Sequence, residues 1–425
     1  MIIFAIIFLL FGAFLSIKNP KYFVIYYILA STKFLGFIDP SSFIIGGVEI
    51  GYFGLNLITV ISIFFNSKWY DFPKNTQLFL YTIIAILLYG ILKPVIDENS
   101  TLIKAFIASK EIWFYSIFIY LIVYRQAIDD RLLLKSLKAI GVFLSIIYIV
   151  GQIVPEFVPP LYYNGSFVRT FYPTYISLAL FLYCIDLKFS LSRSLKDRII
   201  AIILILGLVL AAHSSLIIMT VLGVVFYKYL FNKNLILDKF SIIGAIALSV
   251  FSILFAFVFI DELYNELINT INGIITGEDN SLSSRDVYNE FRWEAINKKK
   301  ELGYGFIHQS SEFMKEINTI STNRFMERFT VIDSGYVDMI IKYGYIGTTI
   351  ILVVFTKYFS KGFLNKYKNP LSLAMSIYLL QYIFINYTWS VYTFAHGIIP
   401  GMLALYLILI SRNFYSKNDR EKLQY

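Results

Sequence analysis

The sequence predicts an all-α polytopic membrane protein with about 12–13 transmembrane helices and one large extracytoplasmic loop. Of its 425 residues, 58% are hydrophobic and 15% are charged, and the mean hydropathy is +0.68. That is too little polar material to cover a soluble surface, and the apolar runs approach the length that crosses a bilayer. Runs such as Ile199 to Leu210 are apolar on every side, whereas barrel strands alternate. Helices are therefore expected to satisfy the backbone within lipid.

Thirteen apolar runs are candidate spans, or twelve if the first pair is irregular. They are Ile2 to Ser16, Tyr22 to Phe37, Ile44 to Phe65, Leu78 to Ile96, Ile112 to Tyr124 (starting near Leu102), Ile140 to Val154, Pro173 to Ile185, Ile199 to Ala212, Ser214 to Leu230, Ile242 to Ile260, Tyr343 to Tyr358, Leu371 to Ile385 and Ala395 to Ile410. We expect one integrated membrane domain, with N-terminal helices in 1–260, a polar loop with short helices in 261–334, and C-terminal helices and a cytoplasmic tail in 335–425.

Charge sets the expected orientation. Seven connectors that alternate to one side of the thirteen spans are each net positive and total +15, whereas 261–334 carries 13 acidic and 8 basic residues. Basic connectors stay in the cytoplasm, so the acidic interval is predicted outside. The same parity places Gly36 to Phe43, Asp97 to Thr101, Pro155 to Phe171, the turn at His213 and Tyr387 to Phe394 outside. The first run has lysines after it and none before, which favours an uncleaved helix over a secretory signal.

Within the loop, Ser281 to Lys300 is predicted to be helical, and Gly303 and Gly305 in LGYGF are predicted to break it. A second segment, Ile332 to Tyr343, leads into the next span. Asp338 and Lys342 lie four residues apart, the spacing of a pair on a helix surface.

Several functions are not supported by the sequence. Three histidines spaced far apart and a single cysteine, Cys184, predict no metal site, and no nucleotide-binding glycine motif is present, so no cofactor is expected. The pI near 9.2 comes from basic residues in short connectors rather than from a nucleic-acid patch, so membrane lipids are the expected partners and nucleic acid is not.

Three arginines predicted to face outside are candidate ligands for a diphosphate. Arg169 stands at the outer end of a span, and Arg285 and Arg292 lie seven residues apart in the loop. Guanidinium groups bind phosphate oxygens in a two-pronged manner and stay charged. The alternatives are that Arg169 only anchors a helix end at the interface and that the other two pair with Asp286 or Glu294.

Two stretches resemble the O-antigen polymerase and O-antigen ligase superfamily: SSRDVYNEFRWEAINKKKELGYGF and, after a variable segment, VIDSGYVDMIIKYGYIG. A third, VRTFYPTYISLAL, resembles the arginine that precedes a helix in that family. The hairpin LGLVLAAHSSLIIMTVLG fits the layout but lacks the Ser-Arg pair of many members. The matching positions are Arg169, Arg285, Arg292, Trp293, Gly303, Gly305, Asp333, Tyr336, Gly344 and Gly347.

The resemblance implies a glycosyltransferase C-like membrane enzyme of the bacterial cytoplasmic (inner) membrane, with its large loop periplasmic or extracellular. It implies a metal-independent polymerase of undecaprenyl-diphosphate-linked oligosaccharide repeat units for O-antigen, capsule or exopolysaccharide, with a chain-length regulator as a further partner. Ligases commonly have a histidine where this chain has Asp333, which favours the polymerase and makes Asp333 the candidate base.

The resemblance leaves other roles open. Asp333 could instead cap the helix that follows it. Arg285 and Arg292 are both diphosphate ligands and candidate catalytic residues. Tyr336, Trp293 and His308 are further candidates, and for His308 a structural role is the alternative. An O-antigen ligase that uses lipid A core as acceptor is the nearer alternative function, and a transporter of lipid-linked glycans is the more distant one.

Overall fold

The computed structural model describes residues 2–32, 44–45, 48–66, 74–98, 100–154, 163–164, 167–168, 172–186, 195–211, 213–231, 292–308, 334–364 and 370–422. Helices make up most of them. The N-terminal elements are α1 (Ile2–Lys18), α2 (Pro20–Ser31), β1 (Ile44–Ile45), β2 (Val48–Glu49), α3 (Ile50–Phe65), α4 (Lys74–Asp97), α5 (Leu102–Ala108), η4 (Ile112–Tyr115), α6 (Ser116–Val123) and α7 (Asp130–Ile153). The remainder are β3 (Tyr163–Asn164), β4 (Phe167–Val168), α8 (Pro173–Asp186), α9 (Leu195–Leu210), α10 (Ser214–Phe231), a helix at 292–298, α16 (Gly335–Leu364), α17 (Pro370–Ile385) and α18 (Ala395–Lys422).

The architecture is that of an all-helical membrane protein. Among the described residues, three helices are long and apolar enough to cross a bilayer: Thr76–Asp97, Asp130–Gln152 and Gly335–Leu364. Leu102–Ala108 and Ile112–Val123 meet at 60°, a geometry that fits either a broken span, which would be the fourth, or a re-entrant loop. Seven further apolar helices are shorter than a full crossing. The predicted number of 12–13 spans therefore stays a prediction, whereas the helical character is confirmed.

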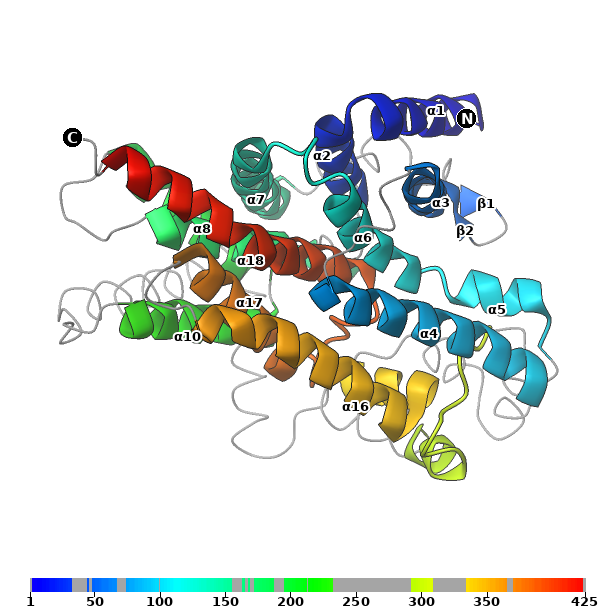
Figure 1. Ribbon diagram of the computed structural model, residues 1–425. Coiled ribbons are helices and arrows are strands. Elements are labelled where there is room, and N and C mark those ends of the chain that lie inside the picture. The colour runs from blue at the N-terminus through cyan, green and yellow to red at the C-terminus, as the bar shows by residue number, and fades with distance from the viewer. Residues whose placement is uncertain are drawn as a thin grey trace, which may run out of the picture.

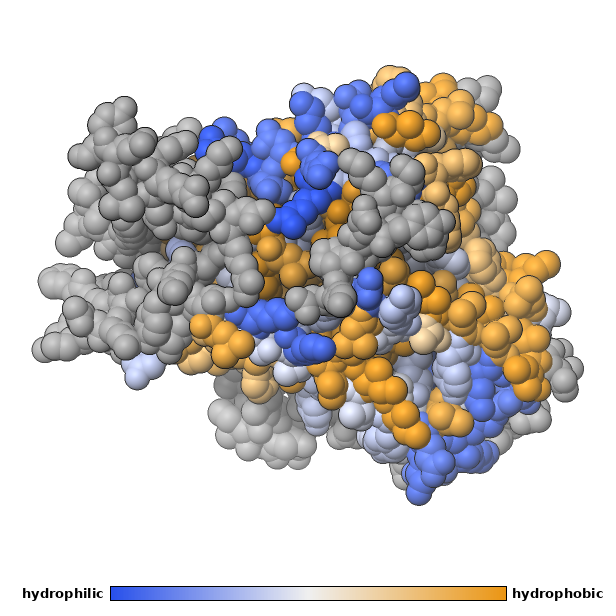
Figure 2. All heavy atoms as spheres, viewed as in Figure 1, coloured by the Kyte–Doolittle hydropathy of each residue, from blue (hydrophilic) through white to orange (hydrophobic). Residues whose placement is uncertain are grey.

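The outer surface of these helices is apolar, as contact with lipid requires. Ile84, Leu88 and Leu92 lie along one face of α4 and are each more than 40% exposed. Ile350 and Val353 do the same on α16. Figure 2 shows hydrophobic residues gathered over both helices and hydrophilic residues at the corner where the 292–298 helix lies. A water-facing protein rarely exposes continuous apolar faces of this kind.

Two groups of helices form the interior. α7 packs against α8 and α9, while α17 packs against α8, α10, α16 and α18. Small residues allow close approach at one of these contacts, since Gly207 on α9 lies directly against Ser145 on α7. Figure 1 shows α4 and α16 side by side, the N-terminus at one end of the molecule and the C-terminus at the other.

Several predicted elements differ in detail from those observed. The run Ile44 to Phe65 begins as the β1–β2 hairpin, and its helix starts only at Ile50. The described part of the segment Ile332 to Tyr343 and the run Tyr343 to Tyr358 both lie in α16, which non-helical backbone at Gly344 divides into two helical parts. Of the helix predicted at Ser281 to Lys300, the described part is helical at 292–298. The predicted span Ile242 to Ile260 lies outside the described residues.

Candidate functional site

The described residues include only part of the predicted site. Arg169, Arg285 and Asp333 lie outside them. Arg292 is the first described residue of the 292–298 helix and is only 5% exposed, whereas its neighbour Trp293 is 40% exposed. Burial of an arginine is costly unless its charge is compensated, so Arg292 occupies a structured environment rather than a solvated surface.

Tyr336, at the start of α16, is a further candidate residue among those described. The Tyr336 hydroxyl donates a hydrogen bond to the carbonyl of Ile383 on α17 at 2.6 Å. Ser334 supplies the first carbonyl of α16, which accepts from the amide of Asp338 at 3.0 Å. Ser334 therefore holds the N-cap position, one residue after Asp333, so the capping role considered for Asp333 falls to its neighbour.

A kink in α16 positions the loop. Gly344 has φ 64° and ψ −175°, which interrupts the helix. In an unbroken helix the amides of Tyr345 and Ile346 would donate to the carbonyls of Ile341 and Lys342. At the kink these four groups are released from one another and must find other partners.

Residues 300–305 of the loop supply those partners. The amide of Tyr345 donates to Lys300 at 2.8 Å, and that of Ile346 donates to Glu301 at 3.2 Å. The freed carbonyls accept from the loop, Ile341 from the amide of Tyr304 at 2.8 Å and Lys342 from that of Gly305 at 2.9 Å. The loop backbone thus replaces the missing turn of hydrogen bonds, and its register against α16 is fixed.

Glycine is required on both sides of this contact. Gly303 and Gly305 have φ values of 68° and 76°, a region that residues with a side chain rarely occupy. A Cβ on Gly305 would lie 2.6 Å from the Gly90 carbonyl of α4, and one on Gly344 would overlap the backbone of Glu301. The predicted break of the loop helix at LGYGF is confirmed, and its physical purpose is this close docking.

An apolar cluster joins the 292–298 helix to α16. Its buried members are Ala295, Ile296, Tyr304, Val337, Ile340 and Ile341. Arg292 is three and four residues before Ala295 and Ile296, so it lies on the same face of its helix. Figure 1 shows this helix beside the N-terminal end of α16, close to the C-terminal end of α4.

The end of α4 closes the other side of the loop. The Phe306 amide donates to the Gly90 carbonyl at 2.7 Å, and the Tyr89 hydroxyl donates to the Leu302 carbonyl. Lys299 forms ion pairs with Asp97, at 3.2 Å, and with Glu98. The segment Asp97 to Thr101 and the large loop, predicted on the same side, therefore do meet. Burial would lower the pKa of Lys299, but hydrogen bonds and charges from Glu98 and Asp97 raise it overall.

Replacing Lys299 with methionine tests the strength of this ion pair. Because the three side chains are between 14% and 29% exposed, we expect a small loss, on the order of 0.5–1 kcal/mol, that shrinks as salt is added. Hydrogen exchange at the Tyr304 and Gly305 amides should become a few-fold faster at low salt. Lys298→Met, on the exposed face, is the matched control, and an equal effect there would contradict the role of the pair.

His308 lies beyond this contact and is partly buried. Burial lowers its pKa first, and the positive charges of Lys104 and Lys110 lower it further. A histidine whose folded-state pKa is depressed stabilises the fold at pH values above its unfolded pKa and loses that contribution as the pH falls through the folded pKa. The loop around His308 is therefore most firmly held above about pH 6.5.

We expect His308 to titrate below 6.5 in the intact protein. The measurement is carbon-13 NMR of labelled histidine as a function of pH, with the His308 signal assigned by its loss in His308→Gln. The double variant Lys104→Gln and Lys110→Gln should move the midpoint upward, because two positive charges are removed. A midpoint above 6.5 in the unaltered protein would refute the electrostatic account.

The burial of the Asp338–Lys342 pair differs from the sequence prediction. They form the expected ion pair, at 2.8 Å, but Asp338 is only 1% exposed, so this is not a pair on a helix surface. The other carboxylate oxygen, Oδ1, has no hydrogen-bond partner among the described residues. The Lys342 ammonium also lies 5.5 Å from the centre of the Phe394 ring, in the 386–394 turn between α17 and α18. The turn is thus part of the site.

Two histidines that are far apart in sequence meet at this turn. His213 and His396 both stack on the indole of Trp389, with ring centres 4.3 and 4.2 Å away. Their spacing along the chain gave no sign of this contact. The described residues contain no group of three or more metal-ligating side chains. The turn at His213 and the segment Tyr387 to Phe394, predicted on one side, do converge.

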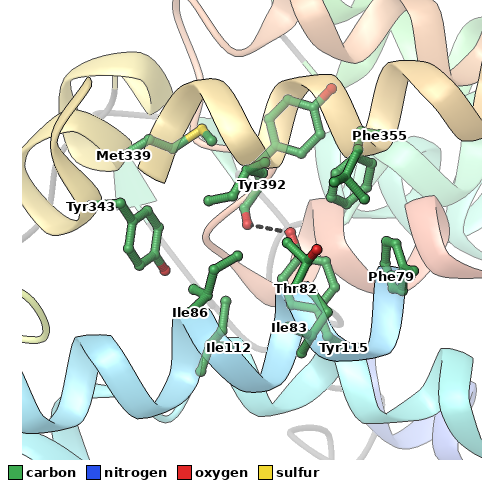
Figure 3. Close-up of a pocket in the computed structure, with 12 residues that line it drawn as sticks. Phe79, Thr82, Ile83, Ile86, Ile112, Tyr115, Met339, Tyr343, Phe355 and Tyr392 are labelled. Atoms are coloured by element: carbon green, nitrogen blue, oxygen red, sulfur yellow. Dashed lines mark hydrogen bonds between the residues drawn. The ribbon is translucent and has the colours of Figure 1, made fainter. Parts of the chain in front are cut away.

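Behind the first turns of α16 lies an apolar pocket. Figure 3 shows side chains from α4, from η4 and from α16 directed toward one another, among them Ile86, Ile112 and Met339. The Tyr115 hydroxyl crosses it and donates to the Tyr392 carbonyl at 2.7 Å. The pocket separates α4 from α16 without adding a charged group to the site.

Sequence reasoning missed Asp338 and the aromatic turn for different reasons. The spacing of Asp338 and Lys342 is the same for an exposed and a buried pair, so it could not show burial. The outside parity of the His213 turn and of Tyr387 to Phe394 did indicate that they could approach each other, but not that their rings would stack.

Comparison with known proteins adds one finding. Residues 199–352 match the family model described as O-antigen ligase. The match spans α9, α10, the loop with its 292–298 helix and the kinked part of α16. No curated protein matches the chain.

Proposed function

We propose that this chain polymerises lipid-linked oligosaccharide repeat units, because the family match at residues 199–352 supports its place in the superfamily of O-antigen ligases and polymerases. The growing glycan would leave its undecaprenyl diphosphate and join a sugar hydroxyl of another lipid-linked unit at the outer face of the bacterial cytoplasmic membrane. The product would be an O-antigen, capsule or exopolysaccharide chain, and a regulator of chain length is a proposed partner.

The chemistry divides into two tasks. The acceptor oxygen forms a bond to the anomeric carbon while the bond from that carbon to the diphosphate oxygen breaks, and the acceptor proton passes to a base. Asp333 is the proposed base or orienting group, and Arg169, Arg285 and Arg292 are the proposed ligands of the diphosphate. Guanidinium groups stabilise the charge that develops on the leaving group without a proton transfer of their own.

One observation supports this arrangement most directly. The loop helix that carries Arg292 is fixed against α16 by backbone hydrogen bonds at Gly344 and by an apolar cluster. Asp333 precedes that same helix by two residues. This packing supports the proposal, because the buried Arg292 is carried by an element that docks on α16, the helix that Asp333 precedes in the sequence.

A ligase is the second candidate, because the matching family model is described as O-antigen ligase. A ligase would hand the finished glycan to lipid A core instead of to another repeat unit. The polymerase is preferred on the presence of Asp333 where ligases commonly have a histidine.

The test is reconstitution of the purified protein in lipid nanodiscs with repeat units linked to a short polyprenyl diphosphate. A ladder of products differing by one repeat unit supports the polymerase. If preformed glycan were transferred only to added lipid A core, the protein would be a ligase and the polymerase proposal would be wrong. If no covalent product formed, and if the protein in sealed vesicles moved the lipid-linked glycan across the membrane, the protein would be a transporter and both enzyme proposals would be wrong.

A further inference from the structure

Three buried oxygen atoms near the start of α16 have no hydrogen-bond partner among the described residues. They are Asp338 Oδ1, Asn386 Oδ1 and Thr393 Oγ1, and their residues are 1%, 0% and 3% exposed. A buried oxygen without a donor costs free energy, so native proteins rarely leave several of them in one region unless a ligand or water supplies the donor.

Contacts of their residues place the three oxygens around one region. The Asn386 side chain lies against Gly335 and its amide nitrogen donates to the Met339 sulfur at 3.4 Å. The backbone carbonyl of Asn386 accepts from the Tyr336 amide at 3.2 Å. Asn386 is thus held on the first turn of α16, where Asp338 also lies. The Lys342 ammonium links Asp338 to the Phe394 ring, and Thr393 is the residue before that ring.

The chemistry of this set selects its ligand. Asn386 Oδ1 and Asp338 Oδ1 only accept hydrogen bonds, so the ligand must offer donors. A phosphate offers oxygens instead and would be repelled by the carboxylate. A cation is disfavoured because Lys342 already neutralises Asp338. Sugar hydroxyls donate, and the half-buried Phe394 ring in the same turn adds the apolar surface that ligand sites combine with a few polar groups.

We propose that Asp338, Asn386 and Thr393 form a subsite that binds hydroxyl groups of the acceptor sugar. The proposal rests on the proposed transfer to a sugar hydroxyl and extends it, since it assigns the recognition of the acceptor to the start of α16 and the 386–394 turn. The arginines would then hold the donor diphosphate, and the two substrates would meet at the N-terminal end of α16.

The experiment compares two equivalent substitutions, Thr393→Val and Thr348→Val. Both residues are buried, and both hydroxyls lack a partner among the described residues. Thr348, however, lies on α16 beyond the Gly344 kink and outside the subsite. Removing an unpaired hydroxyl should not lower stability in either variant. The acceptor probe is the free repeat unit as a short alkyl glycoside, and the donor is a repeat unit on a short polyprenyl diphosphate.

We expect Thr393→Val to raise the KM for the acceptor about ten-fold, the value of one lost hydrogen bond to a ligand, while the KM for the donor changes less than two-fold. Asn386→Leu should act in the same direction. Thr348→Val should alter neither value. Unchanged acceptor KM in Thr393→Val, or an equal rise in Thr348→Val, would show that trapped water satisfies these oxygens and would overturn the proposal.

A separate measurement keeps this test independent of the proposed function. If the unaltered protein transfers nothing, polymerisation fails, but binding of the alkyl glycoside can still be followed by tryptophan fluorescence. Weaker binding by about ten-fold in Thr393→Val alone supports the subsite. Equal binding by both variants, or no binding by the unaltered protein, rejects it.

Discussion

Replacing Gly344 with alanine is expected to abolish glycan transfer while the rest of the membrane bundle stays folded. The backbone conformation alone costs alanine about 1–3 kcal/mol, because φ 64° with ψ −175° is a region that essentially only glycine occupies. Its Cβ would in addition overlap the backbone of Glu301, so the loop must move away. The hydrogen bonds that Tyr304, Gly305, Tyr345 and Ile346 make across the kink would then be lost.

Limited proteolysis in nanodiscs measures this effect together with activity. The run Lys298 to Lys300 should become a trypsin site in Gly344→Ala, at an unchanged level of protein in the membrane. Gly401→Ala in α18 is the matched control, because its new Cβ would lie 3.1 Å from the tip of the Tyr382 ring and its backbone is ordinary. A Gly344→Ala protein with a protected loop and full activity would contradict the docking described for α16.

The position of most helices follows from the sequence because lipid leaves the backbone few alternatives. Ten of the thirteen predicted runs coincide with observed helices over their described residues. Two more, those with irregular starts near Ile44 and Leu102, coincide only in part, and the run Ile242 to Ile260 lies outside the described residues. The two irregular starts were not predictable from hydropathy. Polar residues do stand at both places, Glu49 in the β1–β2 hairpin and Ser109 to Glu111 at the 60° bend, but hydropathy does not report backbone direction.

The glycines of the docked loop were predictable from the sequence, but their packing was not. LGYGF and YGYIG were both singled out, and the structure explains them as the two halves of a single backbone contact. A one-dimensional pattern does not show that Gly303 faces Gly344, since that pairing depends on which carbonyls the kink releases. Burial of Asp338 likewise depends on the 386–394 turn, which lies about 50 residues further along the chain.

Replacing Arg292 is expected to produce the second large effect, a loss of polymer of 100-fold or more in Arg292→Ala. Arg292 is 5% exposed and lies on the helix face that packs toward α16, so an exposed lysine or arginine nearby cannot take its place. If it binds the diphosphate, its charge acts where the leaving group forms, and removal of one such donor typically costs about 10²–10³ in rate.

Arg292→Lys separates a diphosphate ligand from a structural cation. Lysine keeps the charge but loses the planar fork, so a ligand role predicts a fall of about ten-fold or more in transfer rate with unchanged thermal stability. Arg285→Lys should behave alike if both hold one diphosphate. Arg131→Ala, at an exposed position near the start of α7, is the control for loss of an arginine. If Arg292→Lys kept full activity while Arg292→Ala lost stability, Arg292 would be assigned to packing, and the diphosphate would be left to Arg169 and Arg285. The reason is that a purely structural cation requires charge and length but not the two-pronged geometry that phosphate oxygens select.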